Sequence, residues 1–286
     1  MADVRVVDRG TRDVLGEGPM WSAARGCLFW VDIVGRRLSS LRLADGQVTD
    51  WAMPEPIGWV VERAGRTDLL AGFRSGIAAL ALDPVAIEPL HAPEADSPHN
   101  RLNDAKVDAA GRLWFGSKDD RDKEASGAFY RLDPGGSPVR VDDGYQVTNG
   151  PCFSPDGGTL YHSDSGRRLI YRFALRPDGS LGPRETFVAF EEEWGYPDGM
   201  TVDADGHLWV AHWGGGRVTR FDPAGRPVRA IALPATNITS CTFAGDALDR
   251  MFVTSAALGA EGEALAGALF EIDPGVIGLP TNAFAG

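Results

Sequence analysis

The chain has 286 residues, with 28 Lys and Arg residues against 40 Asp and Glu residues, so its formal net charge is −12. This acidic balance, with only three lysines, argues against nucleic acid and anionic membranes as partners. The 36 Gly and 19 Pro residues indicate a folded chain with many turns rather than low complexity. Three widely spaced cysteines, Cys27, Cys152 and Cys241, and an N-terminus without a long apolar run predict a cytoplasmic protein with no disulfide framework.

A turn followed by an apolar strand recurs six times along the chain. The first large apolar residue of each copy falls at Leu28, Leu69, Leu113, Leu160, Leu208 and Met251, which lie 41 to 48 residues apart. A repeat of this length with strand and turn chemistry is typical of four-stranded propeller blades. Helical repeats of that length would show a 3.6-residue apolar period, and the sequence shows none.

The segments after these markers fit antiparallel hairpins. Each marker strand is followed by a second strand and a turn rich in Asp, Pro and Gly, as at Ile77 to Leu82 and then Asp83-Pro84. The last repeat has little room beyond Ile272, whereas a spare alternating strand, Val4 to Val7, precedes the first. We therefore expect one domain over residues 1–286, an all-β six-bladed propeller whose N-terminal strand pairs with the last blade. The alternative is two stacked β-sandwiches of about 140 residues each.

The innermost strand of each blade lines the central channel of a propeller, so polar residues at one level of these strands would meet. The residues 10 or 11 positions before the markers are Glu17, Trp59, Asn103, Asn149, Asp198 and Ser240. Glu17, Asn149 and Asp198 each precede Gly and an apolar strand. An Asn-Gly or Asp-Gly pair alone most often marks a turn, but recurrence at one register favours a shared site.

Two carboxylates and a carboxamide that converge on one axis would be electrostatically unfavourable without a cation between them. The oxygen donors of Glu17, Asn149 and Asp198 suit one divalent ion such as Ca²⁺, Mg²⁺ or Mn²⁺, and Zn²⁺ or Fe²⁺ stays open. Three protein ligands with open positions are typical of a catalytic metal. Asp198 could then accept a proton as general base.

Four stretches of the sequence resemble the SMP-30/gluconolactonase/regucalcin family of six-bladed propellers. They are Leu15-Gly-Glu-Gly-Pro-Met-Trp21, Arg101-Leu-Asn-Asp-Ala-Lys-Val-Asp108, Asn149-Gly-Pro151 and Pro197-Asp-Gly199. Within that family the chain looks most like bacterial aldonolactonases. The resemblance implies Glu17, Asn149 and Asp198 as metal ligands, Asp198 as the general base, and Arg101 and Asn103 as substrate-binding residues.

One stretch departs from the family pattern. Some members have a substrate-binding Glu where this chain has Arg121, preceded by Asp119 and Asp120. Asp120 is the candidate substitute; the alternatives are a loop that serves another sugar, or a solvated charged loop. The resemblance implies metal-dependent hydrolysis of a sugar-acid lactone, such as glucono-, xylono- or arabinonolactone, by a monomer or weak dimer. A non-catalytic, calcium-binding regulatory or interaction propeller is the alternative function.

Overall fold

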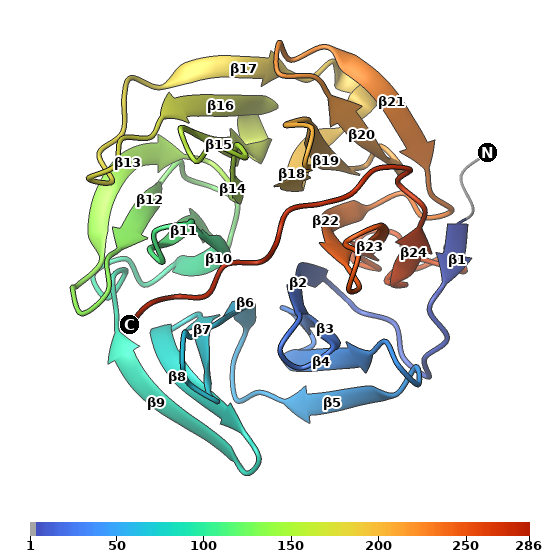
Figure 1. Ribbon diagram of the computed structural model, residues 1–286, viewed down its shortest axis with the longest axis horizontal. Coiled ribbons are helices and arrows are strands. Elements are labelled where there is room, and N and C mark those ends of the chain that lie inside the picture. The colour runs from blue at the N-terminus through green and yellow to red at the C-terminus, as the bar shows by residue number, and fades with distance from the viewer. Residues whose placement is uncertain (1–3) are drawn as a thin grey trace.

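The six repeats form six four-stranded antiparallel sheets arranged as the blades of a ring (Figure 1). The computed structural model describes residues 4–286, so the expected domain over residues 1–286 includes three residues outside the described part and stays a prediction. The first three blades are β2 (Gly16–Ser22), β3 (Cys27–Asp32), β4 (Arg37–Arg42) and β5 (Val48–Ala52); β6 (Ile57–Glu62), β7 (Leu69–Phe73), β8 (Gly76–Leu82) and β9 (Val85–His91); and β10 (Asn100–Val107), β11 (Leu113–Asp119), β12 (Gly127–Leu132) and β13 (Val139–Tyr145).

The other three blades complete the ring. They are β14 (Thr148–Phe153), β15 (Thr159–Asp164), β16 (Leu169–Ala174) and β17 (Glu185–Ala189); β18 (Tyr196–Val202), β19 (Leu208–Trp213), β20 (Arg217–Phe221) and β21 (Pro227–Ala232); and β22 (Ile238–Ala244), β23 (Arg250–Ser255) and β24 (Phe270–Ile272) with β1 (Val4–Val6). Two single turns of 3-10 helix, η1 (Ser165–Arg167) and η2 (Glu192–Trp194), follow β15 and β17. Across residues 4–286, no helix has the length and apolar character needed to cross a membrane.

The predicted ring closure is confirmed. Strand β1 pairs antiparallel with β24, with Val4 opposite Ile272 and Val6 opposite Phe270. The last blade thus takes its outermost strand from the start of the chain, which removes an exposed sheet edge.

Aspartate-capped turns explain why the marker strands begin where they do. The Asp108 carboxylate accepts the backbone N–H groups of Ala110 and Arg112 at 2.9 and 3.0 Å and the indole N–H of Trp114 at 2.8 Å. Gly111 adopts the left-handed conformation that this turn needs, with φ of 75°. The sequence pattern therefore fixes both the turn and the orientation of the first aromatic residue on the next strand.

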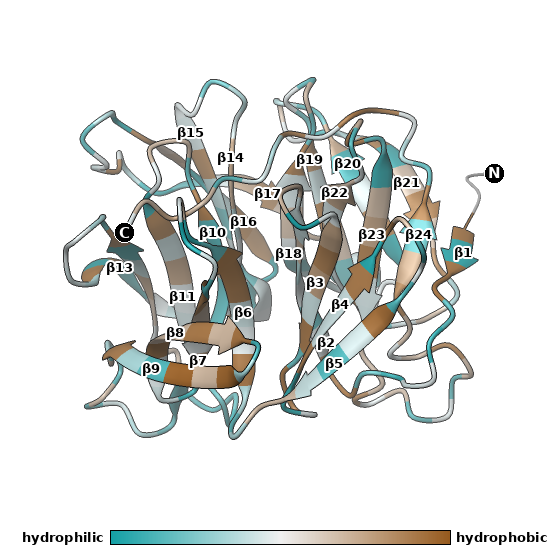
Figure 2. Cartoon of the chain, turned by 60° about the horizontal axis from the view of Figure 1, so that its bottom comes forward, coloured by the Kyte–Doolittle hydropathy of each residue, from teal (hydrophilic) through white to brown (hydrophobic). Residues whose placement is uncertain are grey.

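The hydrophobic core lies between neighbouring blades rather than at the centre of the ring. Among the described residues, six buried apolar clusters each combine side chains from two adjacent blades. One joins Phe29 and Val31 of the first blade to Leu69 and Phe73 of the second. Figure 2 shows the apolar residues along the strands and hydrophilic residues in many of the loops at the two ends. This packing leaves the inner strands free to place polar residues in the channel.

The chain after β24 runs across one face of the ring, at the end where the inner strands finish (Figure 1). Its backbone is bonded to four blades: Gly278 N–H donates to Leu248 O at 2.8 Å, Ile277 O accepts from Ala204 N–H at 2.9 Å, Phe284 N–H donates to Glu62 O at 2.8 Å, and Ala285 N–H donates to Gly111 O at 3.0 Å. We call residues 273–286 the C-terminal strap. It leaves the opposite end of the channel uncovered.

Candidate functional site

Four of the six residues predicted to lie near the axis meet at the end of the channel where the inner strands begin. A cavity of about 490 Å³ there is lined by side chains that include Glu17, Arg101, Asn103, Asn149 and Asp198. Five of the six residues predicted to bind metal or substrate therefore share one cavity. The sixth, Asp120, is not among its lining residues.

Bulges in the inner strands turn these side chains into the channel. Two residues after Glu17 lie opposite a single residue of β3, because Glu17 pairs with Val31 and Met20 with Phe29. The same irregularity follows Asn149 in β14, and in β10 and β18 the two residues that lie opposite a single partner include Asn103 and Asp198, respectively. A bulge bends the strand and redirects its side chains. Gly18 and Gly150, each with φ of 53°, allow this backbone at the first two sites.

Asn149 is held in one orientation by hydrogen bonds on both of its polar atoms. Its Oδ1 accepts from Asn103 Nδ2 at 2.7 Å, and its Nδ2 donates to Ser165 Oγ at 2.9 Å. Ser165 Oγ in turn donates to the Pro197 carbonyl at 2.6 Å, which links β14 to β18. A carboxamide oxygen has a second lone pair, so Asn149 Oδ1 can still coordinate a cation.

The two carboxylates of the cavity are buried, with 6% of Glu17 and 5% of Asp198 exposed. Burial, followed by the charges of Asp198 and Asp104, raises the pKa of Glu17 well above its usual value. Burial and the charge of Asp104 raise the pKa of Asp198 in the same way. Asp198 Oδ1 is buried and has no hydrogen-bond partner within residues 4–286. An orphaned carboxylate oxygen beside a second carboxylate and an oriented carboxamide fits a divalent cation.

Asp104 is a third buried carboxylate near this site that the sequence analysis did not single out. It follows Asn103 in the bulge of β10, and its oxygens accept the backbone N–H groups of Gly150 and Ala105, each at 2.7 Å. Burial raises its pKa, and the positive charge of Lys106 opposes that rise. The sequence signal was the adjacent pair Asn103-Asp104, but which of the two faces the site depends on the bulge.

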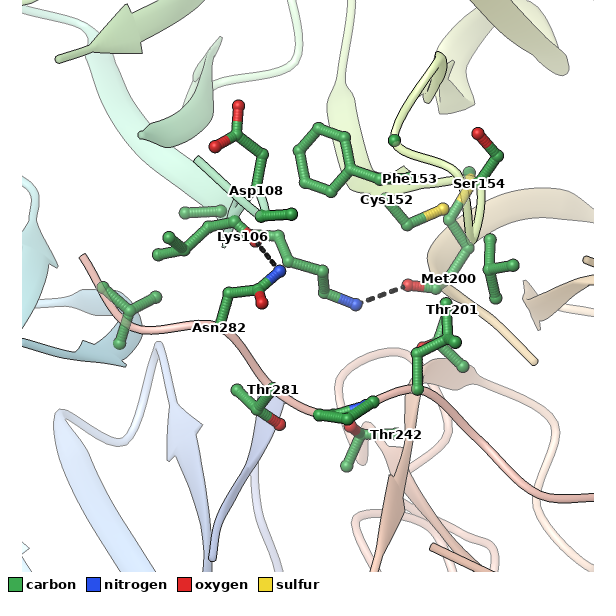
Figure 3. Close-up of a pocket in the computed structure, with 18 of the residues that line it drawn as sticks. Lys106, Asp108, Cys152, Phe153, Ser154, Met200, Thr201, Thr242, Thr281 and Asn282 are labelled. Atoms are coloured by element: carbon green, nitrogen blue, oxygen red, sulfur yellow. Dashed lines mark hydrogen bonds between the residues drawn. The ribbon is translucent and has the colours of Figure 1, made fainter. Parts of the chain in front are cut away.

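A larger cavity of about 760 Å³ lies at the other end of the channel, under the C-terminal strap (Figure 3). Asp104 lines it, as do Trp59 and Ser240 from the two remaining axial positions. Lys106 Nζ donates there to the Met200 carbonyl at 3.1 Å. None of Glu17, Asn149 and Asp198 lines this cavity. The smaller cavity is therefore the candidate site, although the other is larger.

Asp120 lies behind Arg101 instead of on the cavity wall. Its Oδ1 accepts from Arg101 Nε at 2.7 Å and its Oδ2 from Arg74 at 3.1 Å. Arg101 also donates to Asn103 Oδ1 at 2.5 Å. Asp120 thus fixes the guanidinium that faces the cavity. Asp119, which is also outside the cavity lining, caps its own loop by accepting the backbone N–H groups of Arg121, Lys123 and Glu124.

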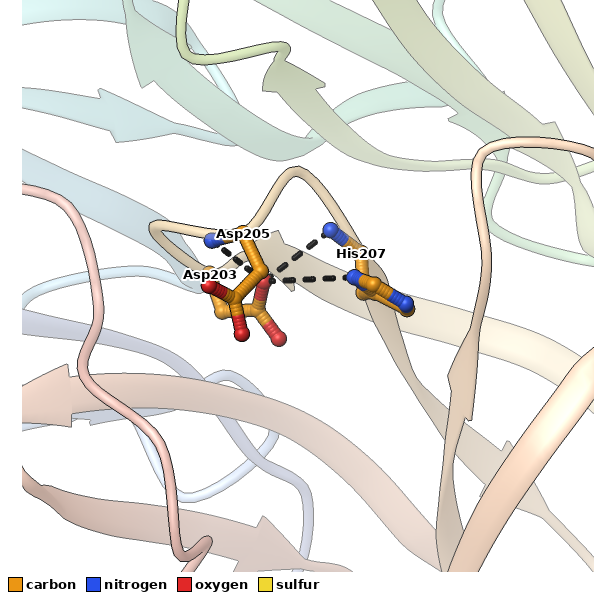
Figure 4. A group of neighbouring side chains, drawn as sticks. All are labelled: Asp203, Asp205 and His207. Atoms are coloured by element: carbon orange, nitrogen blue, oxygen red, sulfur yellow. Dashed lines mark hydrogen bonds and ion pairs between the residues drawn. The ribbon is translucent and has the colours of Figure 1, made fainter.

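A second acidic group, Asp203, Asp205 and His207, lies in the turn after β18 (Figure 4). The Asp203 oxygens already accept the N–H groups of Asp205, His207 and Trp209 and form an ion pair with Arg220 at 2.7 Å. Asp203 therefore plays the same part as Asp108 in its turn. A cation there would compete with a guanidinium and three N–H donors, which disfavours a metal site.

Comparison with known proteins identifies relatives over the whole length of the chain. Residues 15–257 match the family model described as the SMP-30/Gluconolactonase/LRE-like region. Regucalcin from Gallus gallus is 35% identical over 100% of both chains, and L-arabinolactonase from Azospirillum brasilense is 36% identical over 96% of this chain and 94% of its own. The crystal structure of a calcium-binding protein, regucalcin, from Agrobacterium tumefaciens superposes with a TM-score of 0.93 at 29% identity, covering 99% of this chain and 97% of its own.

The resemblance and the six-bladed propeller predicted from the sequence are both confirmed. The matched region includes every predicted site residue, from Glu17 to Asp198. The chain belongs to the SMP-30/gluconolactonase/LRE-like family.

Proposed function

We propose that this protein is a lactonase that hydrolyses a sugar-acid lactone to the free acid in a reaction that depends on a divalent metal. The observation that carries the proposal is the convergence of Glu17, Asn149 and Asp198 in one buried cavity, with Asp198 Oδ1 unpartnered. An L-arabinolactonase among the relatives supports a sugar lactone as the small-molecule partner. Aldonolactones such as glucono-, xylono- and arabinonolactone are the candidates.

The chain's own residues divide the work between binding and proton transfer. Glu17, Asn149 and Asp198 would hold the ion; when bound, it would polarise the lactone carbonyl and lower the pKa of a neighbouring water. Oxygen ligands suit Ca²⁺, Mg²⁺ or Mn²⁺, and Zn²⁺ or Fe²⁺ stays a candidate. A cation also favours the ionised carboxylates over the protonated forms that burial alone promotes.

Asp198 is the proposed general base. As water oxygen bonds to the carbonyl carbon, the Asp198 carboxylate takes its proton; the ring C–O bond then breaks, and the ring oxygen leaves as a hydroxyl carrying that proton. Arg101 and Asn103 are proposed to bind the substrate's oxygens. Within residues 4–286 no acceptor contacts Arg101 Nη2, so that nitrogen can donate to the substrate. Asp120 we propose to position Arg101 rather than to touch the substrate.

Acid release in a pH-stat tests the proposal with purified protein and a panel of aldonolactones. We expect release above the spontaneous rate, loss of it with chelator, and recovery on adding metal. Asp198→Asn should lower kcat by about 100- to 10,000-fold, the usual contribution of a general base. Asp178→Asn, a turn residue outside the cavity lining, is the matched control.

Metal content measured on the same samples separates catalysis from binding. Glu17→Gln removes one charged ligand and should lower the bound metal after dialysis. If wild-type protein retains metal but hydrolyses none of the lactones, the alternative of a calcium-binding, non-catalytic propeller gains support. Equal rates for wild type and Asp198→Asn would exclude Asp198 as the base.

A further inference from the structure

Two cations stand directly opposite each other on neighbouring strands of the third blade. Arg101 of β10 pairs with Lys118 of β11, and both line the cavity that holds Glu17 and Asp198. Arg101 is 5% exposed and Lys118 is 8% exposed. Like charges directly opposite each other destabilise a sheet, and burial increases the cost. The pair therefore needs negative charge close by.

The two cations are neutralised in different ways. Arg101 Nε donates to one carboxylate oxygen of Asp120, and Arg74 donates to the other. Lys118 Nζ contacts Asp122 Oδ1 at 2.5 Å, and the Asp122 side chain is 61% exposed. Burial and the charge of Arg101 lower the pKa of Lys118. An exposed loop carboxylate can move into solvent, so the partner of Lys118 can be exchanged.

The buried charges of the cavity are segregated. Glu17 and Asp198 lie on β2 and β18, whereas Arg101 and Lys118 lie on β10 and β11. The loop that follows β11 adds exposed charges of both signs to the cavity lining, those of Asp122, Lys123 and Glu124. A divalent ion would neutralise the two carboxylates. The buried part of the cavity around Arg101 and Lys118 would then remain positively charged. A neutral sugar needs hydroxyl partners there but gives a buried ammonium group no counter-charge.

We propose that Lys118, together with Arg101, selects lactones that carry an anionic group, a carboxylate, sulfonate or phosphate, on the part of the sugar away from the lactone carbonyl. The inference rests on the proposed function, since it assigns a substrate class to the same cavity. On binding, the anionic group takes the place of Asp122 on Lys118 Nζ. The competing interpretation is that the Lys118–Asp122 ion pair only anchors the loop.

Matched substrates test this inference directly. The assay compares kcat/KM for glucono-1,5-lactone with kcat/KM for its 6-phosphate, its 6-sulfonate analogue and a lactone bearing a terminal carboxylate. For wild type we expect at least one anionic lactone to be favoured by about 10- to 100-fold, the range that one hydrogen bond to a charged group supplies. Comparison of the three anionic lactones shows which anionic group the cavity prefers.

Three variants identify the residue responsible. Lys118→Met keeps the length and buried stem of the side chain, and the ratio of anionic to neutral kcat/KM should fall towards one. Asp122→Asn removes the counter-charge of Lys118 and keeps the size of the side chain, and the ratio should rise. Arg66→Met removes one positive charge from an exposed site outside the cavity lining and should keep the wild-type ratio.

The outcomes distinguish a failure of this inference from a failure of the proposed lactonase function. Hydrolysis of the neutral lactone with no preference for any anionic one overturns the inference and leaves the lactonase proposal intact. A ratio unchanged in both Lys118→Met and Asp122→Asn also overturns it, because the ion pair would then be a loop anchor. If no lactone of either kind is hydrolysed, the proposed function itself fails.

Discussion

Buried aspartates in this protein differ in what their oxygens already bind. Asp203 and Asp198 lie five residues apart, and both are buried. Asp203 is saturated by N–H donors and Arg220, whereas Asp198 keeps one oxygen unpartnered. Residue type and burial alone do not separate a turn cap from a metal ligand; the remaining lone pairs do.

His162 does not line the cavity of Glu17 and Asp198, and its burial makes stability depend on pH. Its ring stacks on Phe129, with centroids 4.0 Å apart, and meets Tyr145 edge-on at 4.9 Å. Burial lowers its pKa to about 3 from a usual value near 6.5. Between these values the unfolded chain binds a proton that the folded one does not, so stability falls as the pH falls from 6.5 towards 3.

Replacing this ring removes that proton linkage. Between pH 6 and pH 4, wild type should lose about 1.4 kcal/mol per pH unit more than His162→Leu, the value for one proton. Urea unfolding at several pH values measures the slope, and each variant's own value at pH 7 serves as its baseline. His99→Leu, at an exposed histidine, controls for the loss of a surface imidazole. Parallel slopes for wild type and His162→Leu would contradict the prediction.

At the residue scale, the repeat register was enough to bring Glu17, Asn149 and Asp198 together, because the same offset from each marker reaches the same level of the channel. The register could not show that Asp120 would turn away to hold Arg101, or that Lys118 would face the cavity. Both depend on loop geometry and on which face of the strand is exposed to the channel. A single sequence carries no signal for either.

At the scale of elements, the bulges of the inner strands are the structures that make the site. The Asn149-Gly150 pair taken alone would indicate a turn, but the structure places Gly150, like Gly18, inside a strand, at a bulge with positive φ. The turn preference and the bulge use the same left-handed conformation, so local chemistry could not distinguish them. Whether such a glycine lies in a turn or in a bulge depends on how the neighbouring strands pair in the fold.

Gly150 should therefore be far more sensitive than a turn glycine of similar φ. A Cβ at Gly150 would lie 2.6 Å from Met200 Cγ and 2.9 Å from Met200 N, whereas a Cβ at Gly157, with φ of 70°, would meet nothing within 4 Å. Both alanine variants pay roughly 1–2 kcal/mol for the left-handed backbone. Gly150→Ala should cost roughly 1–3 kcal/mol more, because Met200 must move.

Urea unfolding of Gly150→Ala and Gly157→Ala measures this difference in stability. Metal content and acid release show whether each variant still binds metal and hydrolyses lactone. We expect Gly157→Ala to keep both properties and Gly150→Ala to lose metal, since Asn149 and Asp198 sit on the two strands that would separate. Equal losses of stability and of metal in the two variants would show that the bulge does not hold the site.

At the scale of the whole molecule, the ring is closed in two ways, of which the sequence predicted one. The alternation of Val4 to Val7 was a strand signal, and β1 does complete the last blade. The C-terminal strap was not foreseen, because residues 273–286 have neither strand alternation nor a helical period. Its contacts include backbone hydrogen bonds to distant blades and one buried ring, which no local pattern reveals.

That ring, Phe284, should carry most of the strap's contribution to stability. It is 5% exposed and packs with Trp59 and Leu102 between the second and third blades, whereas Ile277 on the same strap is 55% exposed. Phe284→Ala should lower the free energy of unfolding by on the order of 3 kcal/mol. Ile277→Ala should change it by less than about 0.5 kcal/mol. Metal titration by calorimetry should be alike in both, because the strap crosses the end of the channel opposite Glu17 and Asp198. If the two alanine variants were equally stable, Phe284 would not be the residue through which the strap stabilises the ring.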